Sequence, residues 1–489
     1  MAPADSHPPV ASARTRAVAV VFAVAGFTSS TWWARLPELA HRAHLTAQGV
    51  GLVLGLLSGG TLAALIVAGP LIHRIGAANV VRGGSALAMA GLIAAGSAVS
   101  WPLLALTLLA VGVGASVCDV AMNVEASKRG MVGWRGGSSS HGGRPADHFY
   151  SFHGAFSLGT VVGAATGAVL AWRGIPVSLH LPAAGALAGV APAIATRWFV
   201  DRGPAKVKTA LARHPEKHTR PAIAIGLLLL GLAFAEGTAF DWLTLAFAEG
   251  YRARHYLAAA GLGLFLLAMT VTRFLGRRLY AGMHPVRVLV GCVALVVLGS
   301  TCVVLGGRAA DAGVTAVAVV LAAIGTVTWG IGAAPGVPLA LRAAGAQGSP
   351  ALRMGIALTI SYGGSLVGPL LLGLIARHWG FLIVLWAAPA VMVLGVAASR
   401  GVQSLGLTLD AVPHPALPGQ QRHGIPAYRQ TAPVSETPVN GHHRSEQLTY
   451  TWAYVPLDDH PPPPGRVDAQ ESAAQGHPGE EGGLPFTGR

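Results

Sequence analysis

Long runs of apolar residues without charge constrain the fold of this chain more than any other feature. One such run, residues 103–117, contains no Asp, Glu, Lys or Arg. With the residues that follow, it is long enough to cross a hydrocarbon core of about 30 Å as a helix rising about 1.5 Å per residue. Hydrophobic residues make up 52% of the chain and charged residues 11%, whereas soluble domains carry roughly 25% charged residues. The sequence therefore predicts a membrane protein.

Twelve predominantly apolar runs predict an all-α membrane protein with twelve transmembrane helices. The first six lie at about residues 17–33, 48–72, 80–100, 103–126, 151–172 and 176–198, and the second six at about 221–245, 256–276, 286–306, 313–338, 353–376 and 380–398. A charged linker at residues 200–220 separates them, so we expect six-helix bundles at residues 14–199 and 221–400. Because Gly112-Val113-Gly114-Ala115 recurs as Gly330-Ile331-Gly332-Ala333, the two bundles are expected to be pseudo-symmetric.

The two ends of the chain differ in character from the apolar runs. Residues 1–13 form a polar, proline-containing lead, and residues 401–489 are rich in proline and poor in long apolar side chains. Such composition is typical of disordered segments. Lys and Arg concentrate in one set of alternate loops, which the positive-inside rule assigns to the cytoplasm together with both termini.

The residue patterns argue against several classes of function. The three cysteines lie in apolar runs and have neither a disulfide framework nor metal-ligand spacing. The chain has no nucleotide-binding P-loop and no Ser, His or Cys pattern at catalytic spacing, so we expect no enzyme activity, no metal and no cofactor. The net charge of +14 is assigned to the cytoplasmic loops rather than to nucleic-acid binding.

Polar residues at membrane depth are the candidate site residues, because a charge there costs on the order of 2.5 to 3.5 kcal/mol and needs a partner. Asp119 and Asn123 are four residues apart near the inner end of the fourth run, so they share one helix face. They either bind substrate or carry a proton, or they form a structural pair that ties this helix to Arg74 or His153. Because histidine titrates near neutral pH, His153 suits proton coupling, with packing against the loop as the alternative. Glu125 is expected to be an ordinary interface charge.

The second half supplies two further candidates. Glu236 lies about fifteen residues into the seventh run, near mid-membrane, the depth at which transporter sites are built. We predict that it carries protons, with helix packing as the alternative. Tyr362, together with Trp32, Trp242 and Trp329, either stacks on a sugar-like ligand or fills the bundle.

Several motifs between residues 15 and 400 occur together. They include Trp33-Ala34-Arg35-Leu36-Pro37-Glu38, Asp119-Val120-Ala121-Met122-Asn123, Phe152-His153-Gly154, Ala235-Glu236-Gly237 and Gly368-Pro369. With these motifs the chain resembles the major facilitator superfamily, and within it the MosC and YbjJ branch of bacterial inner-membrane proteins. The resemblance implies two six-helix bundles around a central cavity.

Gating residues are predicted at both mouths of this cavity. Arg35 and Asp241 are expected near the outer face, where a salt bridge between them would close the outer mouth in the inward-facing state. In the cytoplasmic motif after the second run, His73 stands where the superfamily has an aspartate. An inner gate that relies on that carboxylate must therefore be built differently, and the adjacent Arg74 is the candidate gating residue there.

The sequence thus predicts a secondary active transporter that moves a small solute by alternating access of the two bundles, coupled to protons. The resemblance implies polyol or sugar derivatives only loosely. The alternatives are a drug or metabolite efflux pump of the same fold and a non-transporting membrane sensor or scaffold. We expect a multi-pass monomer in the bacterial inner membrane, with a small-molecule solute, protons and membrane lipid as partners.

Overall fold

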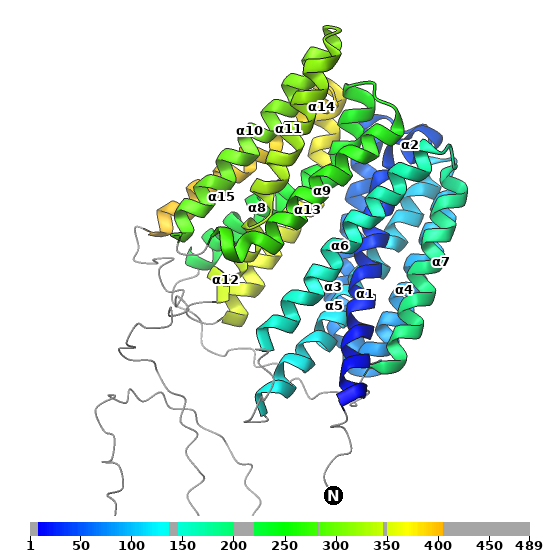
Figure 1. The fold of residues 1–489 in the computed structure, drawn as a ribbon, viewed down its shortest axis with the longest axis vertical. Helices are drawn as coiled ribbons and strands as arrows, with labels where there is room; N and C mark the ends of the chain where they lie inside the picture. The colour runs from blue at the N-terminus through cyan, green and yellow to red at the C-terminus, as the bar shows by residue number, and fades with distance from the viewer. Residues whose placement is uncertain (1–7, 136–144, 200–219, 281–282, 346–349, 404–489) are drawn as a thin grey trace, which may run out of the picture. The chain divides into compact units, whose positions relative to one another are not determined.

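The computed structural model describes residues 8–135, 145–199, 220–280, 283–345 and 350–403, and its regular elements in these ranges are helices (Figure 1). The first half contains α1 (Pro8–Ala34), α2 (Leu36–Arg42), α3 (Ala47–Ile75), α4 (Ala77–Gly96), α5 (Trp101–Arg135), α6 (Pro145–Trp172), α7 (Val177–Ala195) and η1 (Thr196–Trp198). The second half contains α8 (Arg220–Leu245), η2 (Ala246–Gly250), α9 (His255–Leu279), α10 (Pro285–Asp311), α11 (Thr315–Ala333), α12 (Gly336–Gly345), α13 (Pro350–Trp379), α14 (Phe381–Val384) and α15 (Ala387–Gln403).

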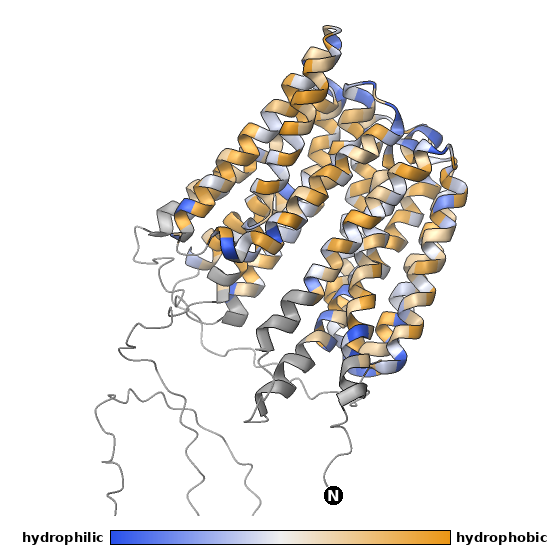
Figure 2. Ribbon diagram, in the orientation of Figure 1, coloured by the Kyte–Doolittle hydropathy of each residue, from blue (hydrophilic) through white to orange (hydrophobic). Residues whose placement is uncertain are grey.

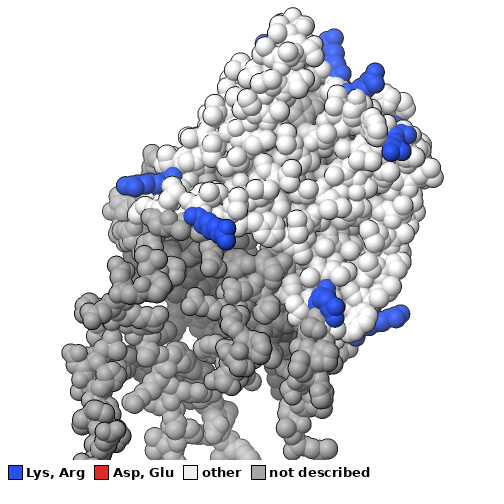
Figure 3. Space-filling model, viewed as in Figure 1, with Lys and Arg blue, Asp and Glu red and all other residues white. Residues whose placement is uncertain are grey.

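Twelve helical segments of the described residues are long and apolar enough to cross a membrane. They coincide with the twelve predicted runs, because hydropathy over about twenty residues is a property of the local sequence alone. Apolar residues dominate the length of these helices (Figure 2). On the face shown in Figure 3, Lys and Arg lie toward the two ends of the helices, with an uncharged band between them. The chain is a multi-pass membrane protein.

The start of the first helix and the loop after the fourth span differ from the predicted ones. The α1 helix begins at Pro8, so residues 8–13, expected to be disordered, are helical. A proline is tolerated in the first turn because its missing N–H has no partner inside the helix. The expected loop at residues 127–150 is also shortened, since α5 continues to Arg135 and α6 begins at Pro145.

The tenth run is divided by a proline. The α11 helix ends at Ala333, and Ala334 still has helical backbone angles. The next residue, Pro335, has no backbone N–H and cannot continue the hydrogen bonds of the helix. The short helix α12 then continues the segment. Residues 200–219 of the linker and residues 404–489 of the predicted tail lie outside the described residues.

The same pairs of spans pack in both halves. The first span contacts the fifth, as α1 with α6 and α8 with α13, and the third contacts the fourth, as α4 with α5 and α10 with α11. The second of these pairs crosses at glycines in each half. A Cβ on Gly114 would lie 2.5 Å from the Gly84 carbonyl oxygen, and one on Gly325 would lie 2.6 Å from that of Gly299. Small residues at such crossings let membrane helices approach closely.

The described helices form one compact unit in which the two bundles meet along two helix pairs, α3 with α13 and α6 with α9. One buried apolar cluster contains residues of both bundles, among them Leu54 and Trp242. On the first pair, a Cβ on Gly51 would lie 2.4 Å from the Pro369 carbonyl oxygen and 2.7 Å from the Gly373 Cα. The backbones of α3 and α13 therefore touch where the bundles join.

We expect Gly51→Ala to destabilise this joint by about 1 to 3 kcal/mol, as overpacking does elsewhere, because the new Cβ would meet backbone atoms of α13. The matched control is Gly69→Ala on the same helix, where an added Cβ meets nothing within 4 Å. Thermal unfolding of the purified full chain in detergent measures both variants. A lower Tm for Gly51→Ala than for Gly69→Ala is expected, and equal values would contradict the close approach.

Candidate functional site

An ion pair between α8 and α9 lies inside the second bundle. Arg273 Nη2 donates to both carboxylate oxygens of Glu236, at 3.0 and 2.9 Å, and Arg273 Nε donates to the carbonyl oxygen of Ala334 at 3.3 Å. The side chains are 28% exposed for Arg273 and 19% exposed for Glu236. The pair is therefore neither sealed in the core nor freely solvated.

Arg273 is a candidate that the sequence analysis missed. It lies within the candidate span His255–Gly276, and an arginine inside a span is costly unless it has a partner. Its signal was present in the sequence. It was concealed because Arg277 and Arg278 follow within five residues and make this end of the run look like the start of a loop.

The partner of Arg273 changes the chemistry open to Glu236. A proton that binds the Glu236 carboxylate removes its negative charge and therefore breaks the ion pair. Proton binding at this residue is thus linked to the contact between α8 and α9. The predicted role of Glu236 as a proton carrier stays a prediction.

Buried aromatic residues hold α8 in place beside this pair. Trp329 Nε1 donates to the Ala235 carbonyl oxygen at 3.1 Å, and the Trp329 ring packs edge-on against Phe265 with centroids 6.1 Å apart. Trp329 and Trp242 are fully buried and Trp32 is 2% exposed. Of the two interpretations of these tryptophans, packing is therefore confirmed. Tyr362 is half-buried and remains a candidate.

His153 brings the first bundle close to the ion pair. It lies on α6 within electrostatic range of Arg273, and its ring packs edge-on against Phe22 with centroids 5.4 Å apart. The neighbouring residues form a direct contact, since a Cβ on Gly154 would lie 3.0 Å from the Phe274 ring. A titratable ring of one bundle and a cation of the other therefore lie near the same α6–α9 contact.

Asp119 and Asn123 form the predicted pair on one face of α5. Asn123 Nδ2 donates to the Asp119 carbonyl oxygen at 2.9 Å and to Oδ1 of its carboxylate at 3.1 Å. These bonds come from Asn123 rather than from Arg74 or His153, the partners considered in the structural interpretation. Asp119 is exposed and lies within electrostatic range of Tyr362 on α13. Polar groups of the two bundles therefore lie near each other here.

The predicted salt bridge between Arg35 and Asp241 is not formed in this structure. Arg35 is 2% exposed and donates through Nε to Glu38 at 2.9 Å and through Nη2 to the Ile175 carbonyl oxygen at 2.8 Å. Glu38 Oε1 in turn accepts from the backbone N–H of Val177 at 3.0 Å. Glu38, one turn along the chain, is the carboxylate partner of Arg35 instead. Arg35 ties the α1–α2 corner to the start of α7 within one bundle.

Asp241 instead joins the two bundles through Trp33. Trp33 Nε1 donates to Asp241 Oδ1 at 3.1 Å, and the Thr244 hydroxyl donates to the Trp33 carbonyl oxygen at 3.3 Å. The Trp33 ring packs against Phe240 with centroids 4.7 Å apart. One residue at the end of α1 thus contacts three residues of α8.

Two charged residues, Glu125 on α5 and Arg74 on α3, were also considered in the sequence. Glu125, expected to be an ordinary interface charge, is 1% exposed, and α5 continues for a further ten residues beyond it. Arg74 is exposed in the last turn of α3. Its predicted gating role stays a prediction.

Comparisons with known proteins agree with this architecture, although no family model matches the chain. The chain is 28% identical over 393 residues to an uncharacterized MFS-type transporter of Yersinia pestis, covering 78% of this chain and 93% of that protein. It is 29% identical over 384 residues to an uncharacterized transporter of Sinorhizobium fredii, covering 76% of this chain and 95% of that protein.

Solved structures of transporters show the same fold. The nucleoside transporter NupG matches with a TM-score of 0.58 at 14% identity, over 81% of this chain and 99% of that chain. A bacterial homolog of the human lysosomal transporter Spinster, inward-facing and unoccupied, matches with a TM-score of 0.61 at 13% identity, over 84% of this chain and 100% of that chain. The resemblance to the major facilitator superfamily is confirmed, and the relatives are transporters rather than enzymes. The MosC and YbjJ branch stays a prediction.

The contact between Trp33 and Asp241 predicts how the bundles separate at this end. A membrane-impermeant thiol reagent reports the separation through Thr244→Cys in a chain whose three native cysteines are replaced by alanine. Removing a hydrogen bond to a carboxylate costs about 1.5 to 3 kcal/mol, so we expect Trp33→Phe to speed labelling by about tenfold or more. Asp241→Asn keeps an acceptor without the charge and should label at a rate between those of the parent and Asp241→Ala, which should label fastest.

The matched control for this experiment is Trp386→Phe. It removes the indole of an exposed tryptophan that lies in the second bundle between α14 and α15. Equal labelling rates for Trp33→Phe and Trp386→Phe would show that the Trp33 hydrogen bond does not hold the bundles together.

Proposed function

We propose that this chain, a multi-pass membrane protein with the major facilitator fold, is a secondary active transporter that couples the movement of a small solute to protons. The observation that carries the proposal is the half-buried ion pair of Glu236 and Arg273, 19% and 28% exposed, inside membrane-spanning helices. Ionisable residues within spans mark substrate and proton pathways. The transporter relatives support membrane transport, which is the general part of the proposal.

In the proposed cycle, a proton binds Glu236 and releases Arg273. The released guanidinium keeps its bond to the Ala334 carbonyl oxygen and lies within electrostatic range of His153 on the other bundle. The energy of the α6–α9 contact therefore differs between the protonated and unprotonated states. Such a difference is what coupling requires, since a ligand shifts a conformational equilibrium only by its differential affinity for the two states.

The solute is proposed to bind between the bundles, near Asp119, Asn123 and Tyr362. A carboxylate, an amide and a phenol supply both donors and acceptors, a set that suits a hydroxylated solute. Polyol and sugar derivatives fit this description. Nucleosides fit it as well, and the structural neighbour NupG is a nucleoside transporter. The contact of Trp33 with Asp241 would close one mouth while the other is open.

The proposed location is the bacterial inner membrane, with both termini in the cytoplasm and the chain acting as a monomer. The distribution of Lys and Arg between alternate loops supports this orientation. In this proposed orientation, the first residues of α1 and the last residues of α15 lie on the cytoplasmic side.

Reconstitution of the full chain in proteoliposomes tests the coupling. We expect Glu236→Gln to abolish solute accumulation driven by a proton gradient while exchange of labelled for unlabelled solute continues, because the amide cannot take up the proton. The matched control is Glu249→Gln, which alters an exposed carboxylate on η2 and should leave accumulation unchanged. The panel comprises polyols, sugars, nucleosides and cationic drugs, the last of which test the efflux alternative.

Two outcomes would overturn this proposal. Proton-driven accumulation by Glu236→Gln at the wild-type rate would exclude Glu236 as the proton carrier. Solute exchange by the wild-type chain without any associated proton movement would make it a facilitator.

A further inference from the structure

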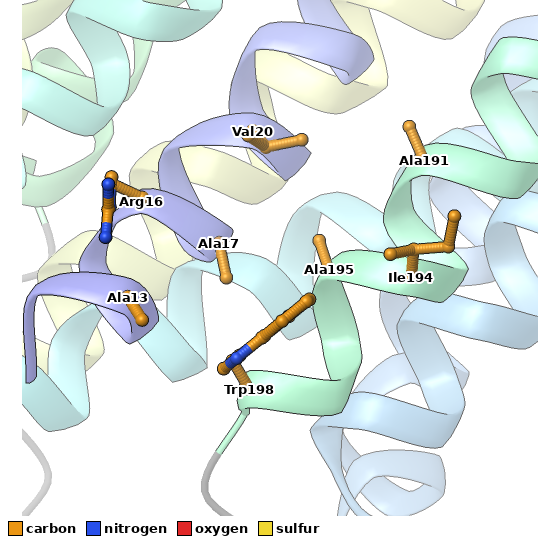
Figure 4. Close-up of a pocket in the computed structure, with 8 residues that line it drawn as sticks. All are labelled: Ala13, Arg16, Ala17, Val20, Ala191, Ile194, Ala195 and Trp198. Carbon is orange, nitrogen blue, oxygen red and sulfur yellow. The ribbon is translucent and has the colours of Figure 1, made fainter. Parts of the chain in front are cut away.

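A groove separates α1 from the end of α7 and η1 in the first bundle (Figure 4). It is an open groove with a volume of about 410 Å³. Its lining residues are Ala13, Arg16, Ala17 and Val20 on α1 and Ala191, Ile194, Ala195 and Trp198 on the other side. In Figure 4, Ala17 and Val20 lie on the side of α1 toward Ala195 and Trp198, whereas the Arg16 side chain extends from the edge of the groove away from η1.

The groove belongs to the outer surface of the helix bundle rather than to its interior. Val20 is 43% exposed, Ile194 45% and Trp198 45%, whereas Ala17 and Ala195 are buried beneath them. All five residues lie within the candidate spans Ala13–Ala34 and Val177–Trp198. Hydrocarbon therefore surrounds this surface, and an occupant has to be apolar along most of its length.

One end of the groove is cationic and lies at a membrane boundary. Arg16 is in the first turn of its candidate span, and Trp198 is the last residue of its own. Tryptophan and arginine at the ends of spans are typical of the headgroup layer. Arg16 is exposed, and the described part of the chain gives its guanidinium neither an ion pair nor a hydrogen bond. An anionic group in the headgroup layer would complement it.

We infer that this groove binds an anionic phospholipid, with one acyl chain along the alanines of α1 and α7 and the phosphate at Arg16. The apolar part of the groove matches an acyl chain, and the cationic end matches the phosphate of the headgroup. A basic group beside a groove between membrane helices favours anionic lipid. The bound lipid would bridge α1 and α7, and would therefore stabilise the first bundle.

Native mass spectrometry of the purified full chain in detergent tests the site. The probes are phosphatidylglycerol, phosphatidylcholine with the same acyl chains, and inorganic phosphate. We expect phosphatidylglycerol to be retained over phosphatidylcholine, and Arg16→Gln to weaken its binding about fivefold, the effect of one basic residue near an anionic membrane surface. Ala191→Leu fills the groove and should weaken the binding of both lipids.

The matched control is Arg287→Gln, which removes an exposed arginine from the first turn of α10 in the other bundle. It should bind phosphatidylglycerol as the wild type does, and thermal unfolding verifies that each variant is folded. Equal weakening by Arg16→Gln and Arg287→Gln would overturn the site in favour of a general effect of charge. Equal retention of the two lipids by the wild type would overturn the headgroup contact. If inorganic phosphate also bound, and Arg16→Gln weakened its binding as much as that of phosphatidylglycerol, the site would be a phosphate site and not a lipid site.

Discussion

Inside a bilayer no water is available to backbone N–H and C=O groups, so each must find its partner within the protein, and an isolated segment can satisfy this only as a helix. The rest of the structure depends on this constraint. Because lipid tails are as apolar as the helix surfaces, helices associate through close packing at small residues rather than by exclusion from water. The crossings of α4 with α5 and of α10 with α11 occur at glycines for this reason. Glycines also allow α3 and α13 to pack closely where the two bundles meet.

The same absence of water governs the polar side chains. Arg273, an arginine inside a candidate span, has a carboxylate and a carbonyl oxygen as partners. Arg35 is 2% exposed and also has both kinds of partner. The two arginines differ in what their bonds join. Those of Arg35 lie within the first bundle, so they need not change when the bundles move, whereas those of Arg273 lie beside the contact with the other bundle.

The sequence was sufficient for the features that depend on neighbouring residues, and insufficient for those that depend on competing partners. The twelve spans follow from local hydropathy, and the Asp119–Asn123 pair follows from helix periodicity, because residues four apart share a face. The partner of Asp241 could not be predicted, because the choice between Arg35 and Trp33 depends on the fold of the α1–α2 corner. Arg273 was missed for a different reason, since its charge merged with those of Arg277 and Arg278.

The α8 helix connects these observations. Glu236 and Asp241 are five residues apart on it, which is about 7.5 Å along the axis, and a helix held on both sides moves as a rigid element. Near one end of this stretch the Ala235 carbonyl oxygen accepts from Trp329, and at the other end Asp241 accepts from Trp33 of the first bundle. In the proposed cycle, a proton that breaks the Glu236–Arg273 pair therefore acts on the same helix that contacts the first bundle through Asp241. Within this proposal, proton binding at Glu236 and the Trp33–Asp241 contact are coupled through less than two turns of one helix.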